Sequence, residues 1–492
     1  MPILHINISK GVQGMESIWR METDIEKRAA LKGNIKAEVA VIGAGMAGIL
    51  TAYFLKQQGK NVVVLEKNCI GGGQTGNTTA KITSQHGSVY STLVKYYGEK
   101  NARLYARANE AAINEFRKLI EKENIDCCFE MVDSYLYSQK DDTVLKKEYH
   151  SAKKLGLPVS YMEDTELPFD VKGALCFKNQ AQFQPLEFVK HISRNLTIYE
   201  NTEVLHVSGH KIRTNNGNVY ADTIVFAAHY PFPRVPGLYF LRQHQERSYV
   251  IAIKGVPKFN GIYYPVDKGL SLRWYKDMLL VGGGNHRTGE STLGKGYEGL
   301  KKQIDIIYEN YTEVTRWSAQ DALSHDELPF IGRFSVLRPY WYVATGFKKW
   351  GMTGSMIAAR LNTALICGKG NEYVKLFTPQ RLHPIASCKK LFTDLGVSIT
   401  GLSKGYFHIP IREKNKPLTG QAKIVRRGFR RYGMYTDNDG ELHTISVKCP
   451  HMGCELAWNP ETRTWDCPCH GSRFTCDGEL IDDPSLKGCM KR

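Results

Sequence analysis

The sequence lacks a recognisable secretory signal and an uninterrupted membrane-spanning run. Its first residues, MPILHINISKGVQGMESIWRMETD, contain no basic segment followed by an apolar one, which a signal peptide requires. The longest apolar run, residues 37–55, has the length of a membrane helix, but Gly43, Gly45 and Gly48 interrupt it. We therefore expect a cytoplasmic protein without a transmembrane segment.

Regularly spaced cysteines are missing from most of the chain. Six of the twelve cysteines follow residue 448. The other six form no regular framework: Cys69, Cys127, Cys128, Cys176, Cys367 and Cys388. The part before residue 448 therefore reads as a reduced, cytosolic protein.

Acidic residues are too few to balance the basic ones, and the formal net charge is +17. No nucleic-acid-binding motif accompanies this excess, and much of it is scattered, so we expect no nucleic-acid partner. Residues 404–431 hold nine Lys or Arg against one acid, whereas residues 432–492 hold six against ten acids. The simplest interpretation of this basic strip is a solvated face. An anionic partner, a peripheral membrane contact or a contact between domains are the alternatives.

The overall amino-acid composition is that of a folded protein. Of the 492 residues, 42% are hydrophobic and 23% are charged, which is ordinary for globular chains. The length allows two or three domains, and no class of disordered chain applies.

A glycine fingerprint lies near the N-terminus, in AEVAVIGAGMAGILTAYFLKQQG at 37–59. The pattern predicts a buried strand, a turn and an amphipathic helix. In G-x-G-x-x-G the first glycine permits a tight turn, the second lets the backbone approach a pyrophosphate, and the third lets the helix pack on the strand. The positive end of the helix then faces the phosphates. A glycine-rich turn without a ligand is the alternative.

Two later features favour a dinucleotide, and FAD over a nicotinamide. The segment NVVVLEK at 61–67 predicts a second buried strand, and it leads to Glu66, which could accept hydrogen bonds from a ribose. A Gly/Thr-rich loop follows at 67–87, and the segment 340–365 again predicts strand, glycine turn and helix. A long ligand such as FAD can use this second helix start, whereas a simple nicotinamide enzyme does not need it.

With GGGQTGNTTAK, ADTIVFAAHYP, DELPFIGR and VATGF, this fingerprint resembles the D-amino-acid oxidase-like FAD superfamily, which includes glycine and sarcosine oxidases. The resemblance implies an α/β Rossmann-like FAD-binding domain and an α+β cap. It implies pyrophosphate contacts at Gly43, Gly45, Ala47 and Gly48, and adenosine contacts at Glu66 and Val204. It implies flavin-side contacts at Gly73, Thr75, Thr78, Thr79, Ala80, Lys81, Gly346, Trp350, Gly351 and Met352, although Trp350 and Met352 could instead be packed in the core. Met46, Lys67 and Ala228 are further residues expected to bind the cofactor.

The family's FAD domain is discontinuous, and the sequence fits this arrangement. We expect nucleotide elements at about 36–90, 195–235 and 315–370, with cap inserts at about 91–190 and 236–314. The first insert begins with helical periodicity, and the second alternates like strands of a sheet over the flavin. Some relatives attach flavin through a cysteine. Because the chain has none between Cys176 and Cys367, we expect noncovalent FAD.

The C-terminal stretch CPHMGCELAWNPETRTWDCPCHGSRF, at 449–474, contains two loops that each hold a Cys and a His two or three residues apart. Each loop can offer a thiolate and an imidazole to a shared centre. Zinc binds both ligand types and is the simple alternative. The spacing C-x-H-x-x-C and then C-P-C-H-G-S resembles the signature of the Rieske [2Fe-2S] domain. With SIWRM, TTAKITSQHG, WSAQD and ATGFKKWGMT, it resembles bacterial FAD-dependent oxidoreductases that end in such a domain.

The Rieske resemblance implies specific roles for these residues. Cys449 and Cys467 would hold one iron and His451 and His470 the other, with a disulfide between Cys454 and Cys469. In respiratory Rieske centres a Ser and a Tyr hydroxyl also donate hydrogen bonds to sulfur. In this sequence Ser472 stands at the serine position, but Phe474 stands at the tyrosine position. Because the tyrosine is replaced, we expect a lower potential than in the respiratory proteins.

We therefore expect residues 1–376 to form the flavoprotein, 377–402 a linker, and 403–492 a small all-β Rieske domain with turns at 437–440 and 477–478. The predicted function is oxidation of a small amine, amino acid or related metabolite, by a dehydrogenase rather than an oxidase. Electrons would pass singly through the cluster to an external carrier protein, or in the reverse direction.

Two alternatives and a set of catalytic candidates complete the prediction. The chain could be an electron-transfer or redox-sensing protein without a substrate of its own. A Rieske oxygenase would need a further mononuclear iron site, and flavoprotein motifs occupy the part of the chain where it would lie. The catalytic candidates are His286, Arg287, Tyr249 and His325, for each of which a structural role is the simpler interpretation.

Overall fold

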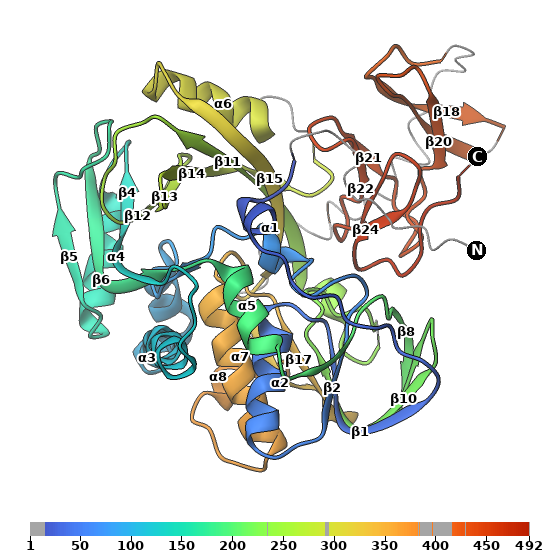
Figure 1. The fold of residues 1–492 in the computed structure, drawn as a ribbon. Coiled ribbons are helices and arrows are strands. Elements are labelled where there is room, and N and C mark those ends of the chain that lie inside the picture. Colours follow the sequence, from blue (N-terminus) through green and yellow to red (C-terminus); the bar gives the residue numbers. More distant parts are fainter. Residues whose placement is uncertain are drawn as a thin grey trace.

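The computed structural model describes residues 15–233, 235–290, 295–381, 383, 396, 416–428 and 430–491. Their helices and strands form a nucleotide-type α/β unit, a cap built on a second sheet, and a C-terminal β unit (Figure 1). Most of the predicted linker 377–402 lies outside the described residues, as do residues 404–415 of the basic strip 404–431.

The nucleotide unit is an eight-stranded, mainly parallel sheet. The carboxyl-terminal parts of its central strands β1 and β10 are apolar and buried, as strands covered on both faces must be, and β2 is buried at every position. The hairpin β8–β9 pairs with β10. The order is β16 (Phe330–Ser335), β17 (Arg338–Thr345), β10 (Asn218–Phe226), β1 (Ile35–Ile42), β2 (Val62–Leu65) and β7 (Thr197–Tyr199), with β8 (Val204–Ser208) and β9 (Lys211–Thr214) beside them.

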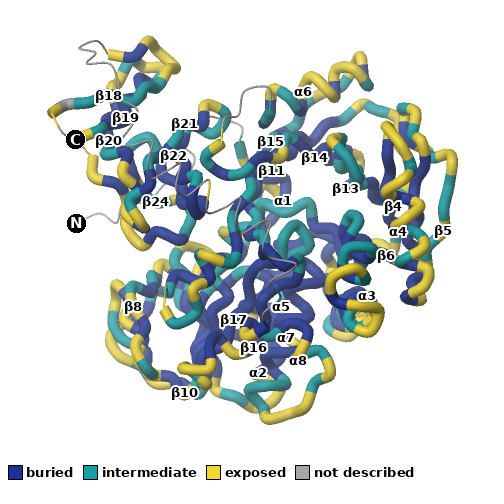
Figure 2. Tube along the Cα trace, turned by 180° about the vertical axis from the view of Figure 1, so that it is seen from behind, coloured by how far each residue is buried: buried dark blue, intermediate teal, exposed yellow. Residues whose placement is uncertain are grey.

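Helices cover this sheet and continue into the main core. In Figure 1, α2 and α7 lie side by side against it, and their buried residues belong to the largest apolar cluster. Figure 2 shows this core as a continuous buried region under exposed loops. The helices are α1 (Ile18–Glu22), α2 (Met46–Gln57), α3 (Val89–Glu123), α4 (Thr143–Lys154), α5 (Pro185–Ser193), α6 (Gly296–Ile307), α7 (Gly351–Ile366) and α8 (Val374–Phe377).

Both predicted inserts contribute strands to one nine-stranded cap sheet. They join where β12 pairs in parallel with β4. The order is β15 (Thr312–Ser324), β11 (Gln243–Lys254), β14 (Met278–Arg287), β13 (Ser271–Tyr275), β12 (Ile262–Pro265), β4 (Glu130–Ser138), β6 (Gly173–Gln182) and β3 (Lys81–Ile82), with β5 (Val159–Met162) beside β6. The predicted return to the nucleotide unit at about 315 thus falls inside a cap strand, since β15 pairs with β11 up to Ser324.

The C-terminal unit consists of two small antiparallel sheets, which confirms the predicted all-β fold. The turn at 437–440 joins β19 to β20, and the turn at Asp477–Gly478 precedes β24. The strands are β18 (Ala422–Arg427), β19 (Arg430–Thr436), β20 (Leu442–Ser446), β21 (Ala457–Asn459), β22 (Thr464–Asp466), β23 (Arg473–Phe474) and β24 (Leu480–Asp482). Among all the residues that the structure describes, no helix combines the length and the apolar character needed to cross a bilayer.

Candidate functional site

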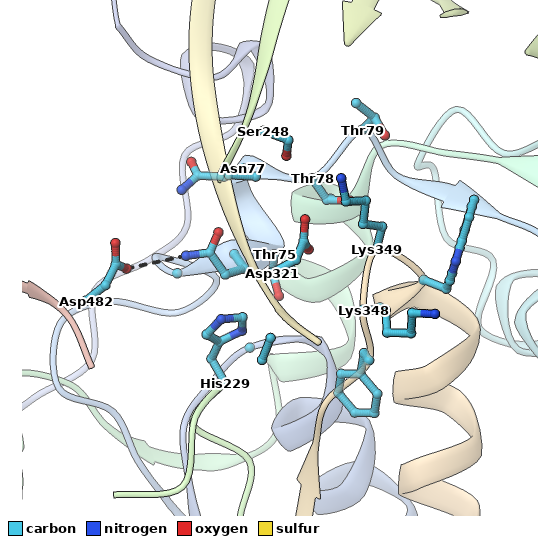
Figure 3. A pocket seen from close by; sticks show the side chains of 18 of the residues that line it. Thr75, Asn77, Thr78, Thr79, His229, Ser248, Asp321, Lys348, Lys349 and Asp482 are labelled. Atoms are coloured by element: carbon cyan, nitrogen blue, oxygen red, sulfur yellow. Dashed lines mark hydrogen bonds between the residues drawn. The ribbon is translucent and has the colours of Figure 1, made fainter. Parts of the chain in front are cut away.

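A cavity of about 710 Å³ lies between the nucleotide sheet and the cap sheet. On one side it meets the carboxyl ends of β1, β2, β10 and β17, which is where open α/β sheets bind their ligands. The other side is formed by the cap strands β11, β14 and β15. Figure 3 shows Thr75, Thr78, Asp321 and Lys349 among the side chains that line it.

The fingerprint glycines are required by close backbone contacts. A Cβ on Gly48 would lie 1.9 Å from the carbonyl oxygen of Gly43, so only glycine lets α2 pack on the turn. Gly43 has a φ of +104°, and a Cβ there would lie 2.7 Å from the Ala227 carbonyl oxygen at the end of β10. Gly45, which lines the cavity, places the start of α2 there without a capping side chain. This helix start fits a pyrophosphate.

Glu66 follows the carboxyl end of β2 and lines the same cavity. Its Oε2 accepts a hydrogen bond from the Ala44 amide at 2.8 Å, and its Oε1 accepts one from the Asn68 amide at 2.9 Å. Burial raises the pKa of the Glu66 carboxyl, and these two amides oppose that shift. Each oxygen keeps a lone pair for a ribose hydroxyl, so the acid fits its predicted role.

The Gly/Thr-rich loop is fastened to both walls of the cavity. Thr75 Oγ1 accepts a hydrogen bond from the Met46 amide at 2.9 Å, which ties the loop to the start of α2. Lys81 donates through Nζ to Ser271 Oγ on the cap strand β13. Burial, with a smaller contribution from Arg273, lowers the pKa of Lys81 to about 7. This amine can therefore be neutral or charged near neutral pH.

The start of α7 closes the opposite end of the cavity. Trp350 precedes the helix, and its ring stacks on His86 with ring centroids 4.6 Å apart and an interplanar angle of 14°. The ring centroid of Tyr264, from the cap, lies 5.1 Å from that of the same indole. Burial lowers the pKa of His86 to about 3, so this imidazole is neutral. The stack fixes Trp350 beside the positive end of α7, where a second part of a long ligand can bind.

The structure brings most of the predicted FAD contacts to this one cavity. The lining residues among them are Gly43, Gly45, Met46, Ala47, Glu66, Lys67, Gly73, Thr75, Thr78, Thr79, Lys81, Val204, Ala228, Gly346, Trp350, Gly351 and Met352. Gly48 and Ala80 lie behind the wall: Gly48 packs on the turn, and Ala80 is fully buried with a φ of +55°. A helix start without a capping side chain, an acid after β2 and a second helix start all line this one cavity, and together they fit FAD.

Several lining residues had no sequence motif of their own. Gln74 and Asn77 stand between predicted contacts in the Gly/Thr-rich loop, so their neighbours were a usable signal. His229 follows Ala228 and has a φ of +57°, and Lys348 and Lys349 precede Trp350. The remaining ones come from the cap or the C-terminal unit and include Ser248, Tyr264, Asp321, Asp482 and Asp483.

Asp321 is the acid that the cap sheet presents to the cavity. In the described part of the chain, no side chain donates a hydrogen bond to its carboxylate or forms an ion pair with it within 4.0 Å. Burial raises the pKa of Asp321 to about 7, although the nearby Lys349 opposes the shift. Lys349 itself pairs with Glu246 at 3.5 Å. The Asp321 carboxylate is thus available to a ligand.

The two cysteine–histidine loops of the C-terminal unit have matching backbone geometry. In the first, the Cys449 amide donates to the Cys454 carbonyl and the Gly453 amide to the Cys449 carbonyl, both at 2.9 Å. In the second, the Cys467 amide donates to the Ser472 carbonyl at 2.8 Å, and the Gly471 amide donates to the Cys467 carbonyl at 2.9 Å. Gly453 and Gly471 have φ values of +84° and +86°, which let each loop turn back.

The four predicted ligands converge between these loops, and all are buried. The thiols of Cys449 and Cys467 are hydrogen-bonded to each other, which lowers the pKa of Cys449 and raises that of Cys467. The rings of His451 and His470 are 4.9 Å apart at 88°. Paired thiols beside paired imidazoles fit a [2Fe-2S] cluster with Cys₂ and His₂ ligation.

The structure also contains the predicted disulfide and describes the surroundings of Ser472 and Phe474. Cys454 and Cys469 form a disulfide, with their Cα atoms 6.6 Å apart. Ser472 is fully buried, and its Oγ accepts a hydrogen bond from the Ser485 amide at 2.9 Å, which leaves its hydroxyl hydrogen to donate elsewhere. Phe474 is fully buried in the apolar cluster around Cys449 and Cys467.

The predicted catalytic candidates lie mainly at the contact between the cap and the C-terminal unit. Arg287 donates to the carbonyl oxygens of Pro468 and Cys469, at 3.2 and 3.3 Å. The hydroxyl of Tyr249 contacts His286 Nε2 at 2.9 Å and accepts a hydrogen bond from Asn459 Nδ2 at 3.3 Å. The His325 ring stacks on His244, with centroids 5.7 Å apart. Of the four candidates, Tyr249 alone is among the described residues that line the cavity.

Comparison with known proteins agrees with both halves of the chain. The family model of FAD dependent oxidoreductase (DAO) matches residues 38–365, and that of the Rieske [2Fe-2S] domain matches residues 409–491. The chain is 35% identical over 492 residues to YhfW of Bacillus subtilis (strain 168), whose name assigns it as a Rieske 2Fe-2S iron-sulfur protein, and 96% of each chain is covered.

More distant relatives match the first part of the chain. Gamma-glutamylputrescine oxidoreductase of Escherichia coli (strain K12) is 24% identical, over 70% of this chain and 86% of that one. The solved structure of glycine oxidase from Geobacillus kaustophilus superimposes with a TM-score of 0.61 at 18% identity, over 70% of this chain and 99% of that one. At this identity the likeness shows the fold.

Proposed function

Because this chain belongs to the FAD dependent oxidoreductase family and ends in a Rieske [2Fe-2S] domain, we propose that it oxidises a small amine, amino acid or related metabolite. Electrons would then pass one at a time to an external carrier protein. The names of two proteins that resemble it, gamma-glutamylputrescine oxidoreductase and glycine oxidase, support this substrate class. We further propose a dehydrogenase rather than an oxidase, since the Rieske domain supplies a built-in electron acceptor, and a cytoplasmic location.

The observation that supports an amine substrate is the Asp321 carboxylate on the cap side of the cavity. A half-buried carboxylate without a hydrogen-bonding or ionic partner is costly, and it gains most from a cationic ligand. Two lysines of the same cavity are already engaged, because Lys349 pairs with Glu246 and Lys348 with Glu327. An ammonium group bound at Asp321 would restore the balance of charge.

The geometry supports a set of residues that would hold the two cofactors. Gly45, Met46 and Ala47 would face the pyrophosphate, Glu66 the ribose, and the start of α7 the flavin. The cluster would be held by Cys449, His451, Cys467 and His470. When bound, FAD supplies a hydride acceptor and the cluster supplies one-electron transfer.

The chain's own contribution to the reaction is binding and proton transfer. The Asp321 carboxylate would orient the ammonium group and accept one of its protons, which leaves the neutral amine needed before its neighbouring C–H bond can break. With a pKa of about 7, Asp321 can accept that proton near neutral pH. The strands β11, β14 and β15 cover the cavity and limit the access of water.

Anaerobic mixing of the holoprotein with a panel of amines and amino acids tests the proposal. We expect at least one cationic amine to bleach the flavin absorbance and then to produce the electron paramagnetic resonance (EPR) signal of a reduced Rieske cluster. Asp321→Asn should lower kcat/KM at least tenfold, since one buried charged contact is removed. Glu203→Gln is the matched control, because Glu203 also lines the cavity but forms an ion pair with Lys67 at 3.1 Å.

The same experiment separates the alternative function. If no amine or amino acid reduces the flavin, while reduced ferredoxin or an NADH-linked reductase does so rapidly, the chain is an electron-transfer protein without a substrate of its own. An Asp321→Asn variant with unchanged kcat/KM would refute the role given to Asp321.

A further inference from the structure

The second ligand loop of the Rieske domain is hydrogen-bonded to the flavoprotein at successive carbonyl groups. Arg287 donates to the carbonyl oxygens of Pro468 at 3.2 Å and Cys469 at 3.3 Å. Gln245 Nε2 donates to that of His470 at 2.8 Å. Gln320 Nε2 donates to that of Gly471 at 2.9 Å. The donors come from three neighbouring cap strands, β14, β11 and β15. The contact is therefore made by backbone groups of the loop that carries Cys467 and His470.

The two surfaces approach too closely for side chains at two points. A Cβ on Gly471 would lie 2.6 Å from Cβ of Gln245, and a Cβ on Gly289 would lie 2.4 Å from the Pro468 nitrogen. The side chains of Gln245 and Gln320 are almost completely buried, and Gln320 Nε2 also donates to Gln245 Oε1 at 2.6 Å. Buried polar groups that are fully hydrogen-bonded define one geometry, because any displacement leaves them unsatisfied.

The imidazole side of the cluster site faces the flavoprotein as well. Phe240 packs edge-on against both rings, with centroid distances of 6.2 Å to His451 and 5.7 Å to His470. The exposed fractions of these two histidines are 5% and 6%. The histidine side of the site is thus covered by the protein's own flavin-binding part.

The same contact continues to the cavity. Gln320 donates through its backbone amide to Gln74 Oε1 at 2.7 Å, and Gln74 lines the cavity. Gln74 Nε2 in turn donates to Asp482 Oδ1 of the Rieske domain at 3.4 Å, a contact drawn as a dashed line in Figure 3. Ala319 and Asp321, on either side of Gln320 in β15, also line the cavity. A continuous path through Gln320 and Gln245 therefore joins Gln74 of the Gly/Thr-rich loop to the backbone of His470.

We propose that the Rieske domain is held in place on the flavoprotein, and that electrons enter the cluster across this contact without domain movement. Phe240, Gln245, Arg287 and Gln320 are the positioning residues, and the external carrier meets another face of the Rieske domain. At each crossing one electron is lost by the flavin and gained by one ferric ion of the cluster. This inference rests on the proposed electron transfer, but not on the identity of the substrate.

The test uses light-driven reduction of the bound flavin by EDTA in the anaerobic holoprotein, which needs no substrate. Reduction of the cluster is then followed by absorbance and EPR, in buffer and in glycerol solutions of rising viscosity. Domain motions on the microsecond to millisecond scale depend on viscosity, whereas transfer across a fixed contact does not. We expect a rate that is independent of viscosity in the wild-type protein.

The variants are the Gln245→Ala/Gln320→Ala double variant and, in case it folds poorly, Phe240→Ala at a half-buried site. Each should slow cluster reduction at least tenfold and make it viscosity-dependent, with the g-values and the flavin content unchanged. Hydrogen–deuterium exchange in residues 467–474 should accelerate, which measures docking without any turnover. Gln380→Ala is the control, because this exposed glutamine also donates to a backbone carbonyl, that of Arg333 at 2.8 Å, but lies outside the contact.

Three outcomes would overturn the inference: a wild-type rate that falls with viscosity, variants with unchanged rate and exchange, or a photoreduced flavin that leaves the cluster oxidised. If amines fail to reduce the flavin but photoreduction still passes electrons at a viscosity-independent rate, the substrate proposal fails and this inference is upheld.

Discussion

Replacing Asp321 with asparagine should stabilise the protein at alkaline pH while impairing its reaction. Burial raises the pKa of this carboxyl group to about 7 in the folded chain, from its ordinary value of 3.8. Asparagine has a similar shape and carries no charge. The substitution therefore removes the cost of burying an ionised group at this position.

The magnitude and the pH window follow from the shift. Below about pH 4 the acid is protonated in both the folded and the unfolded chain, so the variant gains nothing. Between pH 4 and 7 the folded chain keeps a proton that the unfolded chain releases, and the wild-type stability falls as pH rises. Above pH 7 the full cost of about 4 kcal/mol applies, at about 1.4 kcal/mol for each pKa unit. Because the side chain is open to the cavity, screening reduces this to about 2 kcal/mol.

Urea unfolding of the holoprotein at pH 5 and pH 8, followed by flavin fluorescence, measures the effect. The difference in unfolding free energy between Asp321→Asn and wild type should grow by about 1 kcal/mol from pH 5 to pH 8, because part of the shift already acts at pH 5. Asp439→Asn, at an exposed site, should show no such growth. A saturating amine substrate should stabilise the wild type more than the variant. If the difference in unfolding free energy between the variant and the wild type is the same at both pH values, the argument that burial destabilises the ionised Asp321 carboxylate is refuted.

Two further substitutions test the cofactor sites. Phe474→Tyr should raise the cluster's reduction potential, measured by protein-film voltammetry. A hydrogen bond of about 1 kcal/mol that favours the reduced state corresponds to roughly 40 mV for one electron. An unchanged or lower potential would contradict this account. Gly48→Ala should abolish FAD retention or folding, because its Cβ would lie 1.9 Å from the Gly43 carbonyl oxygen, whereas Gly370→Ala, in open space, should retain FAD at wild-type level.

The sequence was most informative where local backbone geometry fixes the residue type. Gly43 and Gly48 have no alternative in their positions, and the apolar runs around Val41 and Val63 can form only buried parallel strands. The same holds for the two ligand loops, in which a glycine four residues after the first cysteine closes each turn. The fold class and both cofactors could therefore be predicted from short motifs.

Features that depend on the meeting of distant segments could not be predicted in this way. Periodicity indicated strands in the second insert, but it could not show that β4 of the first insert pairs with β12 of the second. Asp321 lay within the family motif WSAQD, yet its exposure to the cavity follows from the register between β15 and β11. A shift of that register by one residue would turn Asp321 away from the cavity and Gln320 towards it.

The four catalytic candidates illustrate why residue type alone is ambiguous. Arg287 and His286 are polar residues at the end of a glycine-rich strand, which is equally suitable for an active site and for a contact between domains. The structure supports the second role, because Nε and Nη2 of Arg287 donate to carbonyl oxygens of the Rieske loop. A clue to this contact lies two residues later, at Gly289. This glycine has a positive φ, and a Cβ there would lie 2.4 Å from the Pro468 nitrogen, so another backbone comes close at this position. Gly289 thus allows the backbone at Pro468 to approach the end of the cap strand, which a residue with a Cβ would prevent.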